Sequence, residues 1–144
     1  MPNATLRAAA LILSLTAALP ALAQDKIQKP SQGEMKAAVS AFFDAVNAGD
    51  VAKAQSLFAA GATVEDPVGA ARRPADQFIP ALIAGKAHYA VAMITGSNIN
   101  LVSTAITLSR PNGTGVNAIE IFAFDPDGKI SAMTVNAGRE DRKL

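Results

Sequence analysis

The spacing of apolar residues changes near residue 89, and this change restricts the possible folds more than any other feature. Before it, apolar residues recur every three or four positions, which is typical of an amphipathic helix, as in Met35, Val39, Phe42 and Val46. After it, segments rich in Val, Ile, Thr and Phe predict strands over residues 89–95, 99–109, 115–125 and 129–137. Helices followed by an antiparallel meander predict an α+β fold, in which a curved sheet wraps over the helices and leaves one end of a conical cavity open.

Local signals mark the ends of the first two predicted helices. Ser31 and Glu34 have the spacing of a capping box, which is typical of a helix start. We expect this helix to stop at Gly49, because glycine readily adopts the left-handed conformation found at helix ends. Asp50 can cap a second helix, which we expect to end at Gly61.

The next segment mixes strand and helix signals. Residues 63–66 read as a short strand. Pro74 suits the first turn of a third helix, and Pro80 is expected to shorten or bend that helix, because proline removes a helical hydrogen bond. Turn residues at 111–113 and 125–128 predict two hairpins in the strand-rich half.

The N-terminal residues have the pattern of a secretory signal peptide. Arg7 supplies a positive charge, residues 8–19 form an apolar run too short for a permanent membrane anchor, and Pro20 ends it. Residues 21–23, Ala-Leu-Ala, form a small-residue cleavage site, so we expect cleavage after Ala23 and a secreted or periplasmic protein without stable membrane insertion. The chain then divides into a signal peptide (1–23), a linker (24–30) and one domain (31–144).

Composition excludes several kinds of site and partner. The chain has no cysteine, which excludes thiol catalysis, and a single histidine, His88, which excludes metal sites built from several histidines. After residue 23 the basic and acidic side chains are equal in number, 12 of each, and no long basic cluster occurs. We therefore expect neither nucleic acid nor an anionic membrane surface as the main partner.

Two carboxylates are the candidate catalytic residues, and Asp66 is the first. It stands directly before Pro67, and proline holds the preceding residue in an extended conformation, which fixes the direction of the carboxylate. The alternative is an ordinary Asp-Pro surface turn. Glu65 points to the opposite face of the predicted strand and is the weaker candidate.

Glu120 is the second candidate. Side chains alternate along a strand, so Glu120 shares its face with Ala118, Phe122 and Phe124, in a strand that is apolar on both faces. A carboxylate in such surroundings tends to take up a proton, and a neutral carboxylic acid can donate a hydrogen bond. The alternatives are a charge at the mouth of a cavity or a glutamate paired with Arg or Lys.

A base and a neutral acid in one site can together remove a proton next to a carbonyl group. Asp66 would accept the proton, and Glu120 would hydrogen-bond the oxygen of the resulting enolate. This chemistry needs no cofactor.

Several segments resemble bacterial ketosteroid isomerases, within the nuclear transport factor 2-like, SnoaL-like superfamily. The matching segments cover residues 47–50, 57–59, 62–69, 119–122 and 128–133. The resemblance implies a cone-shaped, cystatin-like fold with three N-terminal helices packed on a curved antiparallel sheet, and a homodimer. It also implies a small apolar carbonyl compound or a steroid-like molecule as the ligand.

The resemblance assigns roles to individual residues. Asp66 falls on the general base, and Glu120 falls on the protonated acid that binds the oxyanion. Phe42 falls on a tyrosine that also donates to the oxyanion, and phenylalanine lacks this hydroxyl group. The cavity is expected to be lined by Phe42, Val68, Phe122 and Asn136.

The sequence therefore favours an exported, cofactor-free protein of the ketosteroid isomerase type. Loss of one oxyanion donor typically lowers turnover by about 10²–10³, so any steroid isomerase activity is expected to be weak. A non-catalytic ligand-binding protein and an enzyme resembling polyketide cyclases or dehydratases are the alternatives, because fold alone does not determine function.

Overall fold

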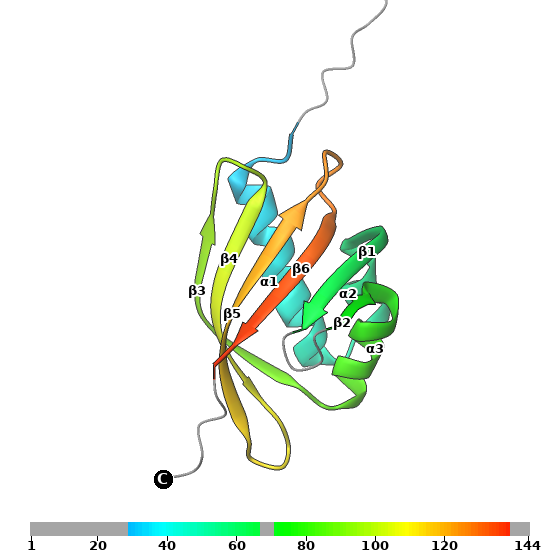
Figure 1. Ribbon diagram of the computed structural model, residues 1–144, viewed down its shortest axis with the longest axis vertical. Coiled ribbons are helices and arrows are strands. Elements are labelled where there is room, and N and C mark those ends of the chain that lie inside the picture. Colours follow the sequence, from blue (N-terminus) through cyan, green and yellow to red (C-terminus); the bar gives the residue numbers. More distant parts are fainter. Residues whose placement is uncertain (1–28, 67–70, 139–144) are drawn as a thin grey trace, which may run out of the picture.

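A computed structural model describes residues 29–66 and 71–138 (Figure 1). Three helices, α1 (Gln32–Ala48), α2 (Val51–Ser56) and α3 (Ala75–Ala84), pack with one sheet. The strands are β1 (Phe58–Asp66), β2 (Ala71–Pro74), β3 (His88–Gly96), β4 (Leu101–Ser109), β5 (Gly115–Phe124) and β6 (Ile130–Ala137). The expected signal peptide and Val68 lie outside the described residues, and within those residues no helix is long and apolar enough to cross a membrane.

The six strands form one sheet in the order β2-β1-β6-β5-β4-β3. Strands β3 to β6 form the expected antiparallel meander, whereas β1 lies parallel to β6. The α+β fold is confirmed, with two corrections: the sheet is mixed, and a second strand, β2, follows the predicted strand β1 before the third helix. Strand β1 follows α1 and α2 and joins the sheet beside β6, the last strand of the meander, in the same direction.

Helix α1 begins and ends where its capping residues predict. The Ser31 side chain accepts a hydrogen bond from the Glu34 backbone at 3.2 Å, and the Glu34 carboxylate accepts one from the Ser31 backbone at 2.8 Å. Gly49 has a left-handed conformation, with φ of 74°, and closes the helix. Asp50 then caps α2 by accepting from the Lys53 backbone at 2.9 Å.

Helix α2 is shorter than the sequence predicts, ending at Ser56 instead of Gly61. The chain leaves the helix because the Leu57 carbonyl accepts a hydrogen bond from the Ile130 backbone at 3.0 Å, which ties it to the sheet. Gly61 lies within β1 with φ of 74°, where the register with β6 shifts. Tertiary pairing thus overrides the helical pattern of this segment.

Helix α3 continues through Pro80, although the sequence predicts a short or bent helix. Proline cannot donate to the carbonyl four residues earlier, which belongs to Asp76. That carbonyl instead accepts a hydrogen bond from the Gln55 side chain of α2 at 3.0 Å. A neighbouring helix therefore supplies the donor that proline removes.

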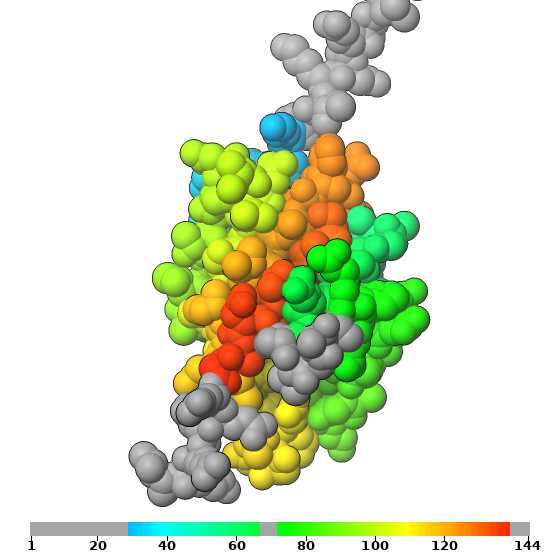
Figure 2. Space-filling model, viewed as in Figure 1, coloured from blue at the N-terminus to red at the C-terminus, as the bar shows by residue number. Residues whose placement is uncertain are grey.

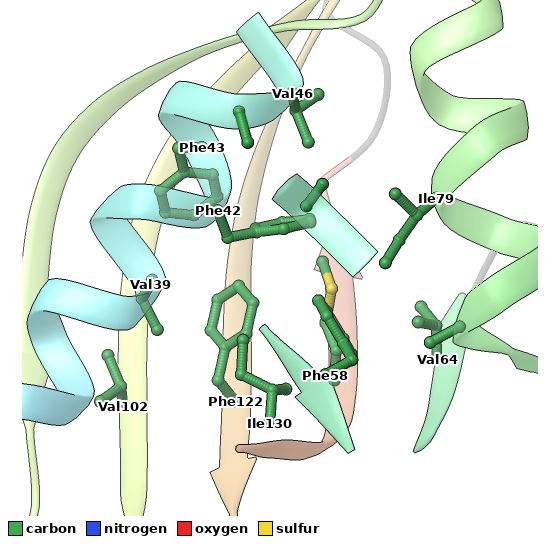
Figure 3. Close-up of a cluster of buried hydrophobic side chains, with 14 of the residues drawn as sticks. Val39, Phe42, Phe43, Val46, Phe58, Val64, Ile79, Val102, Phe122 and Ile130 are labelled. Atoms are coloured by element: carbon green, nitrogen blue, oxygen red, sulfur yellow. The ribbon is translucent and has the colours of Figure 1, made fainter. Parts of the chain in front are cut away.

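The core lies between α1 and the sheet and is rich in aromatic rings (Figure 3). The Phe42 ring centroid lies 5.4 Å from that of Phe58, 5.6 Å from that of Phe43 and 5.8 Å from that of Phe122. These edge-on and tilted contacts are the preferred geometries of aromatic pairs. Phe42 therefore lies at the centre of this aromatic cluster.

Candidate active site

A cavity of about 180 Å³ lies between α3 and the sheet and contains both candidate carboxylates. Its walls are mostly apolar: Phe78, Leu82, Ile106, Leu108, Val116, Ala118, Val135 and Ala137. Four polar side chains also line it: Asp66, Tyr89, Arg110 and Glu120. An apolar pocket with a few convergent polar groups is the usual form of a small-molecule site.

Glu120 is almost completely buried, with 1 % of its surface exposed. It lies on the inward face of β5, as strand alternation predicts, together with Ala118, Phe122 and Phe124. Oε1 accepts a hydrogen bond from the Tyr89 hydroxyl at 3.2 Å, whereas Oε2 has no partner among the described residues. The single ion pair among the described residues joins Arg72 and Glu65, so Glu120 forms no ion pair with a described residue.

The surroundings of Glu120 favour its neutral form. Burial raises the pKa of Glu120 to about 8, and the hydrogen bond from Tyr89 lowers it by less than burial raises it. At neutral pH the side chain is mainly a carboxylic acid, which has one O–H to donate. Oε2 is buried and has no partner among the described residues, so its hydrogen-bonding capacity is unused there.

Asp66 is the last residue of β1 and is partly exposed at the same cavity. Its neighbour Glu65 points elsewhere, is exposed, and forms an ion pair with Arg72 at 3.4 Å. Alternation along β1 therefore separates the two adjacent carboxylates, as the sequence predicts. The two carboxyl groups of the pocket thus differ in environment, one partly solvated and one sealed.

Tyr89 is a site residue that the sequence did not identify. Its side chain is 3 % exposed, lines the cavity, and donates to Glu120. Burial raises the pKa of Tyr89 well above its ordinary value, negative charge on Glu120 and Asp66 raises it further, and Arg110 opposes these effects. The phenol therefore remains protonated and acts as a donor.

The sequence feature that could have identified Tyr89 is its hydroxyl group. A buried tyrosine hydroxyl and a buried carboxyl each need a partner. The strand registers do not reveal the pair, because Tyr89 is level with Leu108, and Leu108 is level with Val116 instead of Glu120. The two side chains therefore meet at an offset that the pairing of the strands does not indicate.

The structure corrects three expected cavity residues. Phe42 and Phe122 have no exposed surface and belong to the aromatic core below the pocket, not to its lining. Asn136 is exposed and lines a hollow on the opposite face of the sheet, because its neighbours Val135 and Ala137 take the inward positions of β6.

Other parts of the described chain do not offer comparable chemistry. A larger hollow of about 520 Å³ lies beside α2, β1 and α3, and Asp76 is its single titratable lining residue. Residues 29–66 and 71–138 contain no group of three His, Cys, Asp or Glu residues that could hold a metal ion. The pair of Asp66 and Glu120 is thus the strongest candidate for acid–base chemistry.

Comparisons with known proteins give a consistent result. The model of the SnoaL-like domain matches residues 39–133. The steroid delta-isomerase of Nocardioides simplex is 35% identical over 107 residues, which cover 69% of this chain and 86% of that protein. Among solved structures, the chain is similar to SalBIII, an epoxide hydrolase/cyclase-like enzyme described in pyran ring formation in the polyether salinomycin. The two are 28% identical with a TM-score of 0.67, and the match covers 76% of this chain and 94% of SalBIII.

A more distant solved structure shares the fold alone. A protein of unknown function with a cystatin-like fold from Methylobium petroleophilum PM1 has a TM-score of 0.71 at 17% identity, covering 80% of this chain and 82% of that protein. At this identity the likeness concerns the arrangement of helices and strands, which agrees with the α+β architecture described above.

Proposed function

The chain belongs to the family of SnoaL-like domains, and we propose that it is a cofactor-free enzyme that moves a proton next to a carbonyl group. The observation that carries the proposal is Glu120: a sealed carboxyl group with one unpartnered oxygen, in the same apolar cavity as Asp66. The steroid delta-isomerase among its relatives supports the same reaction class.

In the proposed reaction, Asp66 and Glu120 have complementary roles. The Asp66 carboxylate takes a proton from the carbon next to the carbonyl, and the electron pair of that C–H bond shifts toward the carbonyl oxygen. Glu120 donates a hydrogen bond through Oε2–H to this oxygen, where negative charge develops. Asp66 then returns the proton at another carbon, which moves the double bond and restores the enzyme.

The size of the cavity favours a small apolar substrate. Pockets that enclose drug-sized ligands usually measure about 300–1,000 Å³, whereas this cavity measures about 180 Å³. A compact enone would fit within it, and a steroid would insert one end. We therefore propose a small apolar carbonyl compound, with steroids as the larger test case.

A steady-state isomerisation assay with a 5-ene-3-ketosteroid and smaller β,γ-unsaturated ketones tests the proposal. Asp66→Asn should abolish turnover, because an amide cannot accept the proton. Glu65→Gln is the matched control: it alters the adjacent carboxylate, which is exposed outside the cavity, and should leave turnover unchanged. Activity that survives Asp66→Asn would show that another group is the base.

A second candidate reaction is ring formation of the kind associated with SalBIII. The same pair could act there, with Asp66 accepting a proton from an attacking hydroxyl and Glu120 protonating the oxygen of an opening epoxide. Turnover of hydroxy-epoxides but not of enones would favour this reaction. Thermal stabilisation by ligands, with no turnover of either substrate class, would favour a non-catalytic binding protein.

We also propose a homodimer formed through the outer face of the sheet, where β4, β5 and β6 lie on the surface (Figure 2). On this face Met93 of β3 and Ile119 of β5 expose 55 % and 45 % of their surfaces. Light scattering should give a dimer mass for the wild type and a monomer mass for Met93→Glu. A wild-type monomer at micromolar concentration would reject the dimer.

Export remains a proposal that rests on the N-terminal sequence. The intact mass of the protein recovered from outside the cytoplasm should correspond to a chain that starts at Gln24. An intact N-terminus there would contradict cleavage after Ala23.

A further inference from the structure

The Tyr89 hydroxyl contacts the one oxygen of Glu120 that has a partner. It donates to Oε1 at 3.2 Å, and Oε2 has no partner in the part of the chain that is described. A neutral carboxylic acid carries its proton on one oxygen only. The carbonyl-type oxygen of a carboxylic acid is the stronger acceptor, so the hydrogen bond from the phenol to Oε1 favours the acid proton on Oε2.

The backbone of Tyr89 is fixed from both sides by Asn47, near the end of α1. The Asn47 amide donates to the Tyr89 carbonyl at 2.9 Å, and its oxygen accepts from the Tyr89 backbone N–H at 2.7 Å. Strand β3 is at the edge of the sheet, where outward-facing N–H and C=O groups lack a neighbouring strand. Asn47 therefore takes the place of a strand partner at this residue.

The Tyr89 ring is also confined by aromatic neighbours. Its centroid lies 4.8 Å from that of Phe43 and 6.3 Å from that of Phe42, both buried residues of α1. With the backbone clamped and the ring packed, the hydroxyl has little freedom to leave Glu120. The terminal torsion of a glutamate is otherwise broad and roughly two-fold, so an unheld carboxyl could exchange its two oxygens.

We propose that Tyr89 is a positioning residue that holds Oε1 of Glu120, confines the acid proton to Oε2, and so directs the donor toward the ligand. This inference rests on the proposed role of Glu120 as the acid of the site. The titratable and charged groups that face this carboxyl across the cavity are Asp66, Tyr89 and Arg110. Tyr89 acts through Glu120, whereas the proton is moved by Asp66.

The decisive experiment follows the infrared carbonyl band of protonated Glu120 as a function of pH, with Glu120→Gln to assign the band. Tyr89→Phe removes the phenol and keeps the ring. Because a donor to Oε1 stabilises the charged form, its loss should increase the proton affinity of Glu120, by about tenfold. Thr104→Val is the matched control, since it removes a buried hydroxyl that contacts the Glu120 backbone oxygen at 3.4 Å instead of the carboxyl, and it should leave the titration unchanged.

A second perturbation makes the phenol a stronger donor. Tyr89 is the only tyrosine in the chain, so biosynthetic replacement of tyrosine by fluorotyrosine changes this site alone. The proton affinity of Glu120 should then fall. This measurement also covers the case in which Tyr89→Phe fails to fold.

The outcomes separate this inference from the proposed function. An unchanged Glu120 titration in both variants would overturn the inference, even if Asp66→Asn still abolished turnover. A lower proton affinity in Tyr89→Phe would also overturn it, because Glu120 would then be the donor and Tyr89 the acceptor. If the titration shifts as expected, Tyr89→Phe should lower kcat about tenfold with little change in KM, and shift the alkaline limb of the kcat profile to higher pH. A wild type without turnover but with the expected shift would support the positioning and reject the enzyme.

Discussion

Replacing Glu120 by Gln should make the stability of the protein less dependent on pH. The pKa of this carboxyl is about 8 in the folded chain, against 4.5 for an ordinary glutamate. Below pH 4.5 it is neutral in both the folded and unfolded states, so its pKa shift carries no penalty. As the pH rises toward 8, the unfolded chain releases the proton and the folded chain keeps it, so the free energy of unfolding decreases.

The size of this effect follows from the difference between the two pKa values. Each unit corresponds to about 1.4 kcal/mol, so the group should cost about 5 kcal/mol of stability by pH 8. That cost is a large part of the roughly 5–15 kcal/mol that stabilises a typical domain. Glutamine has nearly the same shape, stays neutral at every pH, and can still accept the hydrogen bond from Tyr89.

Urea denaturation of both proteins at pH values from 4.5 to 8.5 measures the effect. The difference in unfolding free energy between variant and wild type should grow in favour of Glu120→Gln as the pH rises, by up to about 5 kcal/mol. Most other titrating groups are common to both proteins and cancel in this difference. A difference that stays constant with pH would refute the reasoning, since it would mean that Glu120 titrates normally in the folded chain.

Three further changes test how the local structure is stabilised. Ser31→Ala should lower the free energy of unfolding by about 1 kcal/mol, because it removes the side-chain acceptor that caps α1. Gly49→Ala should cost about 1 kcal/mol through backbone strain alone, since φ is 74° and an added Cβ would meet no atom within 4 Å. Gln55→Ala should lower the free energy of unfolding by about 1 kcal/mol, because its side chain donates to the Asp76 carbonyl. The cost should be smaller in a Pro80→Ala background, where the new backbone N–H can bond to the same carbonyl. Equal costs in the two backgrounds, measured by urea denaturation, would contradict this account of α3.

Local patterns predict those parts of the fold whose partners lie near in sequence. The capping box at Ser31, the left-handed Gly49 and the two hairpins each depend on contacts within a few residues, and all of them appear in the structure. The burial of Glu120 follows from alternation along one strand. These features need no knowledge of which element packs against which.

The unpredicted features depend on contacts that are distant in sequence. Strand β1 begins at Phe58 because the Leu57 carbonyl bonds to Ile130, and no pattern near residue 58 indicates that partner. The helix tolerates Pro80 because Gln55 lies beside it. Tyr89 reaches Glu120 across β4, between strand positions that are out of register.

The stability cost of Glu120 is itself an argument for a function at this cavity. A leucine or methionine would fill a similar volume next to Phe122 without a group that must stay protonated or unpaired. The chain instead carries a carboxyl with 1 % exposure, one satisfied oxygen and one oxygen without a partner among the described residues. Core packing cannot account for that choice, because packing alone would favour the apolar residue. A ligand oxygen that accepts a hydrogen bond from Oε2 would satisfy the remaining group. Glu120 is therefore better explained as a hydrogen-bond donor to a bound carbonyl than as a core residue.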